Sequence, residues 1–359
     1  MKPWLKIFSV FFFVAAMAGG VFLYYDLRPE IISTSVIENT EVQTVDEDKT
    51  VQEADEIVGD NEVKQDGTEQ KEIINTPTKN QTGGGPVGNQ GPYFHSLYFG
   101  TAADLDHWTL GETPIIEHAS VPDLILLNKP VGSLSAGTLV TYFVDAHSGG
   151  GEEQVGMLSS SDNGAHWSDL ADITVEGKPS GMKPVDPSIV QLDDGRLRLY
   201  FYDISGAAAG IIGPHSIYSA VSNDGINFVF EGEVFTSNAS MTDPEVVYFN
   251  NTWLMYYAVG QNVSLAVSDD GLSFTDRGRI NNVISIPGAI ITDGQLNIFG
   301  CSNPVSYAVS SDGETFGSRH ETTGIGEVGT VDFYCGPAPV LLEDGTFVMI
   351  IKWQGGTIR

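Results

Sequence analysis

The sequence predicts an all-β fold, a five-bladed β-propeller, with an N-terminal transmembrane helix and a disordered linker before it. The first observation is a repeated phrase of Ser, one residue, Asp, Gly, two variable residues and a closing aromatic, at intervals of about 40 to 60 residues. The second is that alternating apolar strands and short turns follow Tyr93, without a convincing amphipathic helix. Repeats of this length, each with its own strands, are typical of propeller blades. The copies are Ser222–Phe228, Ser268–Phe274, Ser310–Phe316 and the one-residue-longer Ser160–Trp167.

The repeated phrase predicts a hairpin turn. Gly225, Gly271 and Gly313 can adopt positive φ without steric cost, and the preceding Asp can accept hydrogen bonds from amides of the turn. The closing aromatic is expected to pack between neighbouring blades. We therefore interpret the Asp residues of these turns as structural and not catalytic.

The first 25 residues predict the compartment. Lys2 and Lys6 precede an apolar run, Ile7–Tyr25, that would span about 28 Å as a helix, close to the hydrocarbon core of a bilayer. The positive residues place the amino terminus in the cytoplasm. Residues 1–25 are thus a signal-anchor, or a signal peptide cleaved near Ala16–Ala18. The rest is expected outside the cytoplasm, as a single-pass cell-membrane protein or, after cleavage, a secreted one.

Residues 26–92 predict an acidic disordered linker. The segment is rich in Glu, Asp, Gln, Thr and Asn and ends near Gly83-Gly84-Gly85-Pro86, so it cannot bury enough apolar surface to fold. The formal net charge of −30 argues against nucleic acid as a partner. Cys301 and Cys335 have no metal-type spacing; they form either one bridge between adjacent blades or two buried thiols.

Residues 93–359 predict five blades. Each unit begins with an inner strand, continues with a second strand rich in Tyr or Phe, and ends at the repeated turn. The fifth unit lacks its outer strands, and Ser96–Phe99 with the turn Asp104–Trp108 is expected to supply them and close the ring. The units run from Val121 to Trp167, Val185 to Phe228, Thr242 to Phe274, Ile286 to Phe316 and Cys335 to Ile351.

Carboxylates on the inner strands predict chemistry at the propeller axis. Asp123, Asp186 and Asp243 are expected to occupy the same relative position in three consecutive inner strands, and Glu245 to share a face with Asp243. Hydrolysis of a glycosidic bond needs two such groups, and crowding separates their pKa values. The structural alternative is that an Asp beside Pro caps the backbone at the start of the strand.

The opening phrases Val121-Pro122-Asp123, Val185-Asp186-Pro187 and Thr242-Asp243-Pro244-Glu245, with the repeated turns, resemble those of the five-bladed propeller glycosidases. This superfamily contains arabinanases, β-xylosidases and invertases, including glycoside hydrolase family 43. The resemblance implies that Asp123 is the general base and that Asp243 orients the acid. The family's acid, a Glu one blade later, is replaced by Pro287-Gly288-Ala289. Glu245 would then supply the proton, Asp186 and Asp243 would share the work, or the hydrolase machinery is absent.

Further candidates surround these carboxylates. The resemblance implies no required cofactor and permits a structural calcium in the central channel. Aromatic side chains can stack on sugars, although most of those available belong to second strands, where interblade packing is expected. The substrate-binding candidates are Glu327, Asp332, His118 and His215, and the aromatic ones are Tyr142, Tyr202, Tyr257 and Trp353.

We therefore predict a membrane-tethered, extracytoplasmic glycoside hydrolase that acts on a neutral oligosaccharide or polysaccharide. The first alternative is a non-catalytic carbohydrate-binding or adhesion propeller. The second is a sialidase, because Ser160–Trp167 fits a sialidase-type turn. Sialidases hold their substrate with several pocket arginines, whereas Arg196 and Arg198 lie on a second strand, which argues against this class.

Overall fold

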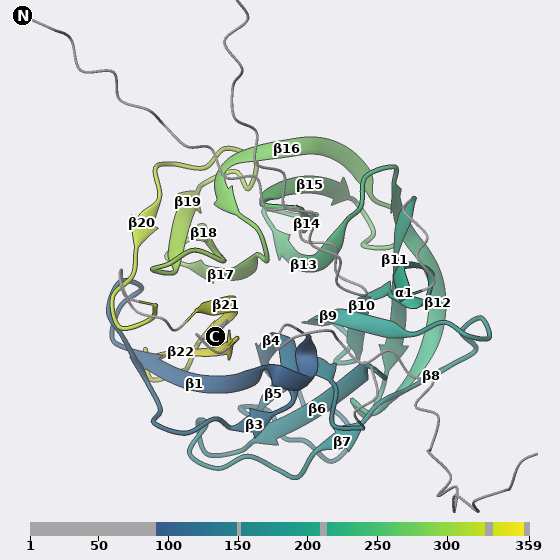
Figure 1. Cartoon of the computed structure of the whole chain (residues 1–359), viewed down its shortest axis with the longest axis horizontal. Coiled ribbons are helices and arrows are strands. Elements are labelled where there is room, and N and C mark those ends of the chain that lie inside the picture. Colours follow the sequence, from purple (N-terminus) through teal and green to yellow (C-terminus); the bar gives the residue numbers. More distant parts are fainter. Residues whose placement is uncertain (1–90, 149–151, 209–213, 327–332, 355–359) are drawn as a thin grey trace, which may run out of the picture. The chain divides into compact units, whose positions relative to one another are not determined.

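The computed structural model describes residues 91–148, 152–208, 214–326 and 333–354. Their strands form five sheets arranged around one axis (Figure 1). The innermost strands contact one another in the cyclic order β4, β9, β13, β17, β21 and back to β4, which closes the ring. The predicted five-bladed propeller is therefore confirmed.

Four of the blades follow chain order from the inner strand outward. The first contains β4 (Ala119–Leu126), β5 (Leu139–Asp145), β6 (Gln154–Ser160) and β7 (Ala171–Asp172). The second contains β9 (Pro184–Gln191), β10 (Leu197–Asp203), β11 (His215–Ser222) and β12 (Asn227–Ser237), with β8 (Thr174–Glu176) parallel to β12. The third contains β13 (Thr242–Phe249), β14 (Thr252–Val259), β15 (Asn262–Ser268) and β16 (Thr275–Ile284). The fourth contains β17 (Gly288–Thr292), β18 (Gln295–Gly300), β19 (Ser306–Ser310) and β20 (His320–Glu321).

The fifth blade combines both ends of the described chain, as predicted. Its inner strands are β21 (Tyr334–Leu341) and β22 (Phe347–Trp353), and β1 (Ser96–Ala102) pairs antiparallel with β22 from Ser96↔Trp353 to Ala102↔Phe347. β2 (Trp108–Leu110) and β3 (Ile116–Glu117) both pair with β1. This pairing covers strand edges that would otherwise be exposed.

Helix is scarce in the described residues, which contain the 3₁₀ turn η1 (Pro92–Phe94) and the four-residue α1 (Ser205–Ala208). Within these ranges, no helix has the length and hydrophobicity needed to cross a membrane. The predicted transmembrane helix and the linker up to residue 90 lie outside the described residues.

The repeated turns have the predicted structural role. In the second blade, Ser222 Oγ accepts a hydrogen bond from Gly225 N at 2.9 Å, and Asp224 Oδ1 accepts one from Asn227 N at 2.7 Å. Gly225 has a φ of 82°. Equivalent backbone bonds from Thr315 and Glu314, together with the Ser310 hydroxyl, lower the pKa of Asp312 to about 2. These Asp side chains therefore stabilise their own turns as ionised acceptors.

Each turn also joins two blades. A second-strand Tyr donates its hydroxyl proton to the turn Gly carbonyl of the next blade, and its ring meets the closing aromatic edge-on. The hydroxyl contacts are Tyr142 to Gly225 at 2.7 Å, Tyr200 to Gly271 at 2.8 Å and Tyr256 to Gly313 at 2.6 Å. The ring pairs are Tyr142–Phe228, Tyr200–Phe274, Tyr256–Phe316 and, at the junction with the fifth blade, Phe299–Trp108.

Interblade packing accounts for most of the Tyr residues considered as sugar-stacking groups. Tyr142, Tyr202 and Tyr257 are all buried. They belong to core clusters shared between strands, so they are components of the core. Trp353 is partly buried at the end of β22 and packs edge-on against Tyr98.

Candidate functional site

Four of the inner strands are interrupted by the same feature, a residue with positive φ followed by proline, and in blade four this step directly precedes β17. Pro has no N–H to donate to the sheet, and such a step produces a bulge in the strand. Register shifts mark the bulge in blades one, two, three and five. A positive φ costs a non-glycine residue about 1 kcal/mol or more, so strain is repeated around the axis. The pre-proline residues are Val121 (φ 43°), Asp186 (50°), Asp243 (50°), Ile286 (55°) and Gly336 (62°).

The bulge separates the predicted carboxylates into two tiers. The pre-proline tier contains Asp186 and Asp243, and the post-proline tier contains Asp123 and Glu245. The expectation that Asp123 shares the position of Asp186 and Asp243 is therefore wrong. It was wrong because the Asp follows the proline in blade one and precedes it in blades two and three. The shared face expected for Asp243 and Glu245 is not supported either, because the bulge interrupts strand alternation and the two carboxyls have different partners.

The post-proline tier ties adjacent blades together. In three consecutive blades, the side chain after the proline accepts a hydrogen bond from a backbone N–H of the next inner strand. Such an acceptor satisfies a buried N–H that would otherwise have no partner. The contacts are Asp123 Oδ2 with Ile189 N at 2.6 Å, Ser188 Oγ with Val246 N at 2.9 Å and Glu245 Oε1 with Ala289 N at 2.8 Å.

Burial dominates the protonation of this tier. It raises the pKa of Asp123 to about 6, although bonds from the Ile189 and Leu124 amides favour the ionised form. Burial and then the charge of Asp123 raise the pKa of Glu245 well above its usual value. Both carboxyls are committed to backbone amides, which supports the structural alternative for them.

The pre-proline tier contains two interacting carboxyls. Burial raises the pKa of Asp186 well above its usual value, and the charges of Asp243 and Glu153 raise it further. The backbone N–H of Asp243 opposes this shift by favouring the ionised form of Asp186. Asp186 therefore also reaches the next inner strand.

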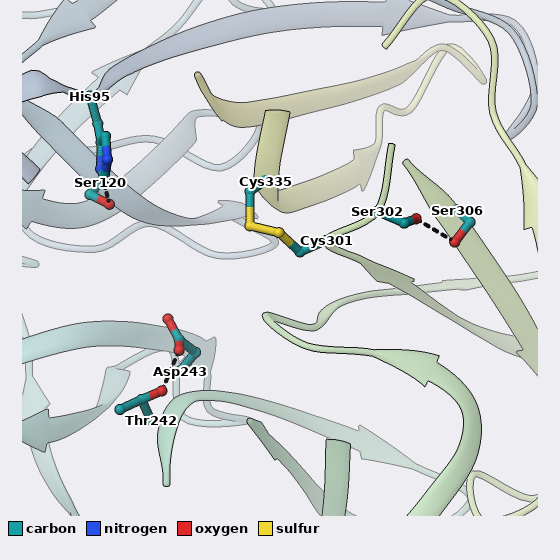
Figure 2. Close-up of a disulfide and its surroundings, with 8 residues drawn as sticks. All are labelled: His95, Ser120, Thr242, Asp243, Cys301, Ser302, Ser306 and Cys335. Atoms are coloured by element: carbon teal, nitrogen blue, oxygen red, sulfur yellow. Dashed lines mark hydrogen bonds between the residues drawn. A yellow bond between two sulfur atoms is a disulfide. The ribbon is translucent and has the colours of Figure 1, made fainter. Parts of the chain in front are cut away.

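Asp243 differs from the other three carboxyls. Its Oδ2 accepts a hydrogen bond from Thr242 Oγ1 at 2.5 Å (Figure 2), whereas its Oδ1 is buried without a hydrogen-bond partner among the described residues. Burial raises the pKa of Asp243, and the Thr242 hydroxyl and then the charge of Lys352 oppose that shift. Because buried acceptors are nearly always satisfied, this unpartnered Oδ1 distinguishes Asp243 from the other carboxyls.

A buried lysine lies close to the two pre-proline carboxyls. Lys352, on β22, is 1% exposed; burial lowers its pKa, and the charges of Asp243 and Asp186 oppose that change. His95 is also buried, with Nδ1 3.0 Å from Ser120 Oγ (Figure 2). Burial, and then the charge of Lys352, lower the pKa of His95 to about 3, so this ring is neutral.

Sequence reasoning missed Lys352, His95 and Glu153. A signal for the lysine was present, because it is the single charge in the apolar strand Phe347–Trp353, where a charged side chain needs a buried partner. The residues do not fit the calcium permitted in the channel. Calcium needs six to eight oxygen ligands, whereas the positive charge of buried Lys352 already acts on this acidic pair. In the described ranges, no group of three or more His, Cys, Asp or Glu could hold a metal ion.

Of the four predicted substrate-binding residues, the structure describes His118 and His215. His118 Nδ1 donates to the Tyr93 carbonyl, and His215 Nδ1 lies 2.8 Å from the Met241 carbonyl. Both histidines therefore hold backbone segments beside inner strands. Glu327 and Asp332 lie outside the described residues, and no finding tests a substrate-binding role for any of the four.

The cysteines form an interblade bridge, the first of the two alternatives that the sequence left open. The disulfide joins Cys301, which follows β18, to Cys335 in β21, with Cα atoms 4.6 Å apart (Figure 2). Cys335 is the register partner of Lys352. The bridge therefore anchors the inner strand beside the lysine to the fourth blade.

The two arginines considered in connection with a sialidase form ion pairs with carboxylates. Arg198 Nε lies 2.8 Å from Glu231 Oε2, and Arg196 Nη2 lies 2.8 Å from Asp194 Oδ2. Both belong to the second strand of blade two and its preceding turn. They do not provide an arginine cluster at the axis.

No protein-family model matches the chain, and no curated protein matches it. Among solved structures, it resembles the family 93 α-L-arabinofuranosidase of Fusarium graminearum (12% identity, 68% of this chain and 81% of that one, TM-score 0.46). It also resembles an α-L-arabinanase of Penicillium chrysogenum (15%, 72% and 85%, 0.45) and a thermostable family 43 glycoside hydrolase (13%, 64% and 82%, 0.47). These structures belong to the propeller glycosidases that the blade-opening phrases resemble. At such identities the likeness is one of fold, and the chemistry depends on this chain's own side chains.

Proposed function

We propose that this protein is an extracytoplasmic glycoside hydrolase that cleaves glycosidic bonds of a neutral glycan with Asp186 and Asp243. The observation that supports this most directly is the buried Oδ1 of Asp243, an acceptor without a partner among the described residues. It belongs to a carboxyl that interacts with a second one, Asp186, from the adjacent inner strand. Paired carboxyls with separated protonation states are what glycoside hydrolysis requires.

The environments of the two carboxyls suggest their roles. Asp186 has its pKa raised well above the usual value by burial and then by Asp243 and Glu153, so it can hold a proton near neutral pH and act as general acid. Asp243 has two groups that favour its ionised form, the Thr242 hydroxyl and the charge of Lys352. In the proposed reaction, the Asp186 proton passes to the leaving oxygen. Water adds to the anomeric carbon, and its proton passes to Asp243.

This assignment revises the roles that the resemblance implied. Asp123 is predicted to be a blade tie and not the general base, because both of its oxygens accept backbone N–H groups at 2.7 and 2.6 Å. Glu245 likewise binds the Ala289 amide and would not supply the proton. Of the three options left open by the missing fourth-blade Glu, we propose that Asp186 and Asp243 share the work.

The proposed location and substrate charge have separate support. A disulfide is typical of an oxidising compartment outside the cytoplasm, which agrees with the expected signal-anchor or signal peptide at residues 1–25. The net charge of −30 would repel polyanionic glycans, so a neutral oligosaccharide or polysaccharide is the proposed partner. Membrane attachment through the N-terminal segment remains part of the proposal.

A non-catalytic carbohydrate-binding propeller is the second candidate. It is favoured by the fourth and fifth inner strands, where the two tiers hold Ile286 and Gly288 and then Gly336 and Ala338, none of which is titratable. Glycan binding that persists without turnover, and that is unchanged in Asp243→Asn, would support this candidate over the hydrolase.

The test is hydrolysis by the full-length chain, purified with detergent. Reducing-sugar release would be measured on aryl glycosides and on plant and microbial glycans, with Asp243→Asn and Asp186→Asn as paired variants. We expect turnover of at least one substrate by the wild type and loss of it in both variants. A folded wild type that hydrolyses none of these substrates would contradict the proposed function.

A further inference from the structure

The carboxyl pair lies at one end of the propeller, where inner strands begin and second strands end. Asp186 and Asp243 are near the starts of β9 and β13, and Lys352 is near the end of β22. In the first blade, this same end holds His118, just before β4, and His147, just after β5. η1, the short dark-blue helix beside β4 in Figure 1, packs against β4 and β5. Its aromatic residues therefore lie at the end that holds the carboxyl pair.

Two aromatic side chains of η1 are exposed there. Tyr93 is 38% and Phe94 is 37% exposed, unlike the second-strand aromatics of the core. The Tyr93 ring stacks on His118 with centroids 4.0 Å apart and planes 15° apart, and Phe94 meets Tyr93 edge-on at 5.4 Å. The two rings are contiguous, and contiguous exposed apolar surface is a feature of ligand-binding sites.

Hydrogen bonds hold this stack in place. His118 Nδ1 donates to the Tyr93 carbonyl, and the His118 ring meets His147 edge-on at 5.4 Å. His147 Nδ1 in turn lies 2.6 Å from Oδ1 of the buried Asp145. The aromatic surface is thus pre-organised, which reduces the entropy lost when a ligand binds.

The residue that follows this aromatic surface in the chain is the buried His95. The His95 carbonyl accepts a backbone hydrogen bond from Ala119 N at 3.2 Å. Its imidazole contacts Ser120 Oγ and senses the charge of Lys352, which also acts on Asp243. A ligand on the aromatic surface would therefore lie at the same end of the propeller as the carboxyl pair.

We propose that Tyr93, Phe94 and His118 form an accessory subsite that binds the apolar C–H face of a neutral sugar ring. The chemical class of this ligand rests on the proposed function. Aromatic faces combine apolar area with rigidity, and sugar-sized ligands bind where such area lies beside a few polar groups. A glycan that occupies this aromatic subsite and reaches Asp243 needs more than one sugar unit. The protein is accordingly an enzyme for oligosaccharides and polysaccharides, with weak affinity for single-sugar glycosides.

The aromatic subsite can be tested by affinity electrophoresis of the full-length chain in gels containing linear arabinan, xylan, galactan, levan or mixed-linkage glucan. The variant is Tyr93→Ala combined with Phe94→Ala. The matched control is Tyr248→Ala, which removes a 52% exposed Tyr near the opposite end of β13. Thermal unfolding confirms that each variant is folded, and Tyr93→Phe tests whether the ring alone suffices.

We expect at least one glycan to retard the wild type, the control and Tyr93→Phe. The double variant should bind that glycan about threefold to tenfold more weakly for each ring lost. Equal retardation of wild type and double variant, or no retardation of the wild type in any gel, would overturn the subsite. Since retardation requires no hydrolysis, a retarded but inactive wild type would contradict the proposed function and leave the aromatic subsite supported.

Discussion

Asp243→Asn and Asp123→Asn are predicted to differ in their effect on activity, and this contrast tests the two-tier interpretation. In Asp243→Asn, the new carboxamide oxygen can still accept the Thr242 hydroxyl proton, while its NH₂ replaces an oxygen without a described partner. No backbone bond is lost, but the buried Lys352 loses one of the two negative charges that favour its ionised form, and Asp186 remains as the other. We therefore expect the unfolding temperature to fall, because a buried charge is left with less compensation.

Activity should fall sharply in that variant. An amide cannot take a proton from water, and losing a general base costs about 10²- to 10⁴-fold in kcat. The charge of Asp243 raises the pKa of Asp186, so removing it should lower that pKa. Residual activity should consequently decline at a lower pH on the alkaline side of the profile.

Asp123→Asn changes the hydrogen bonds by which this side chain joins the first inner strand to the second. Its two oxygens accept N–H groups of Leu124 and Ile189, and an Asn places an NH₂ against one of them. An unsatisfied buried N–H costs about 1–3 kcal/mol. For a domain of this size, each 1 kcal/mol lowers the unfolding temperature by about 2–4 °C. We expect the unfolding temperature to fall and kcat to stay within a few-fold of the wild type.

The assay pairs differential scanning fluorimetry with initial rates on the best substrate from the glycan panel. Two results would refute the assignment. One is an Asp243→Asn variant with nearly wild-type kcat. The other is an Asp123→Asn variant that is inactive but has an unchanged unfolding temperature, because that pattern belongs to a catalytic base.

Three further predictions concern the frame around the site. Tyr200→Phe leaves the Gly271 carbonyl without its 2.8 Å donor and should destabilise the fold by about 1–3 kcal/mol in chemical denaturation; no change would contradict the interblade role. Replacing Cys301 and Cys335 with Ser removes a link between residues 34 apart and should lower the free energy of unfolding by about 2–4 kcal/mol. If reduction of the wild type left its unfolding unchanged, this prediction would be wrong. The pKa of His95 in the folded protein, about 3, lies below its ordinary value of 6.5, so its contribution to stability is present above pH 6.5 and is lost as pH falls toward 3. The stability advantage of the wild type over His95→Asn should shrink by about 1.4 kcal/mol per unit between pH 6 and 4, and a constant difference would be inconsistent with a neutral buried ring.

Local patterns in the chain were sufficient to predict the frame. The turn Ser222–Phe228 and its copies combine a residue that must adopt positive φ, a short acceptor and a closing aromatic, and these needs are met within seven residues. The pairing of Ser96–Ala102 with β22 followed from counting strands, because an incomplete blade leaves exposed edges. Spacing alone does not place Cys301 beside Cys335, so only the folded structure distinguishes a disulfide from two buried thiols.

The roles of the carboxyls depended on tertiary structure. Asp123 and Asp186 both adjoin a proline, yet Asp123, after its proline, binds the Ile189 amide, whereas Asp186, before its proline, is also influenced by the charge of Asp243. Lys352 is remote from Asp243 in sequence and meets it only because the ring closes. The blades can be predicted from the chain alone, because turn chemistry and strand alternation act over a few residues. Which acids interact follows from the folded arrangement, because electrostatics and burial depend on distance in space.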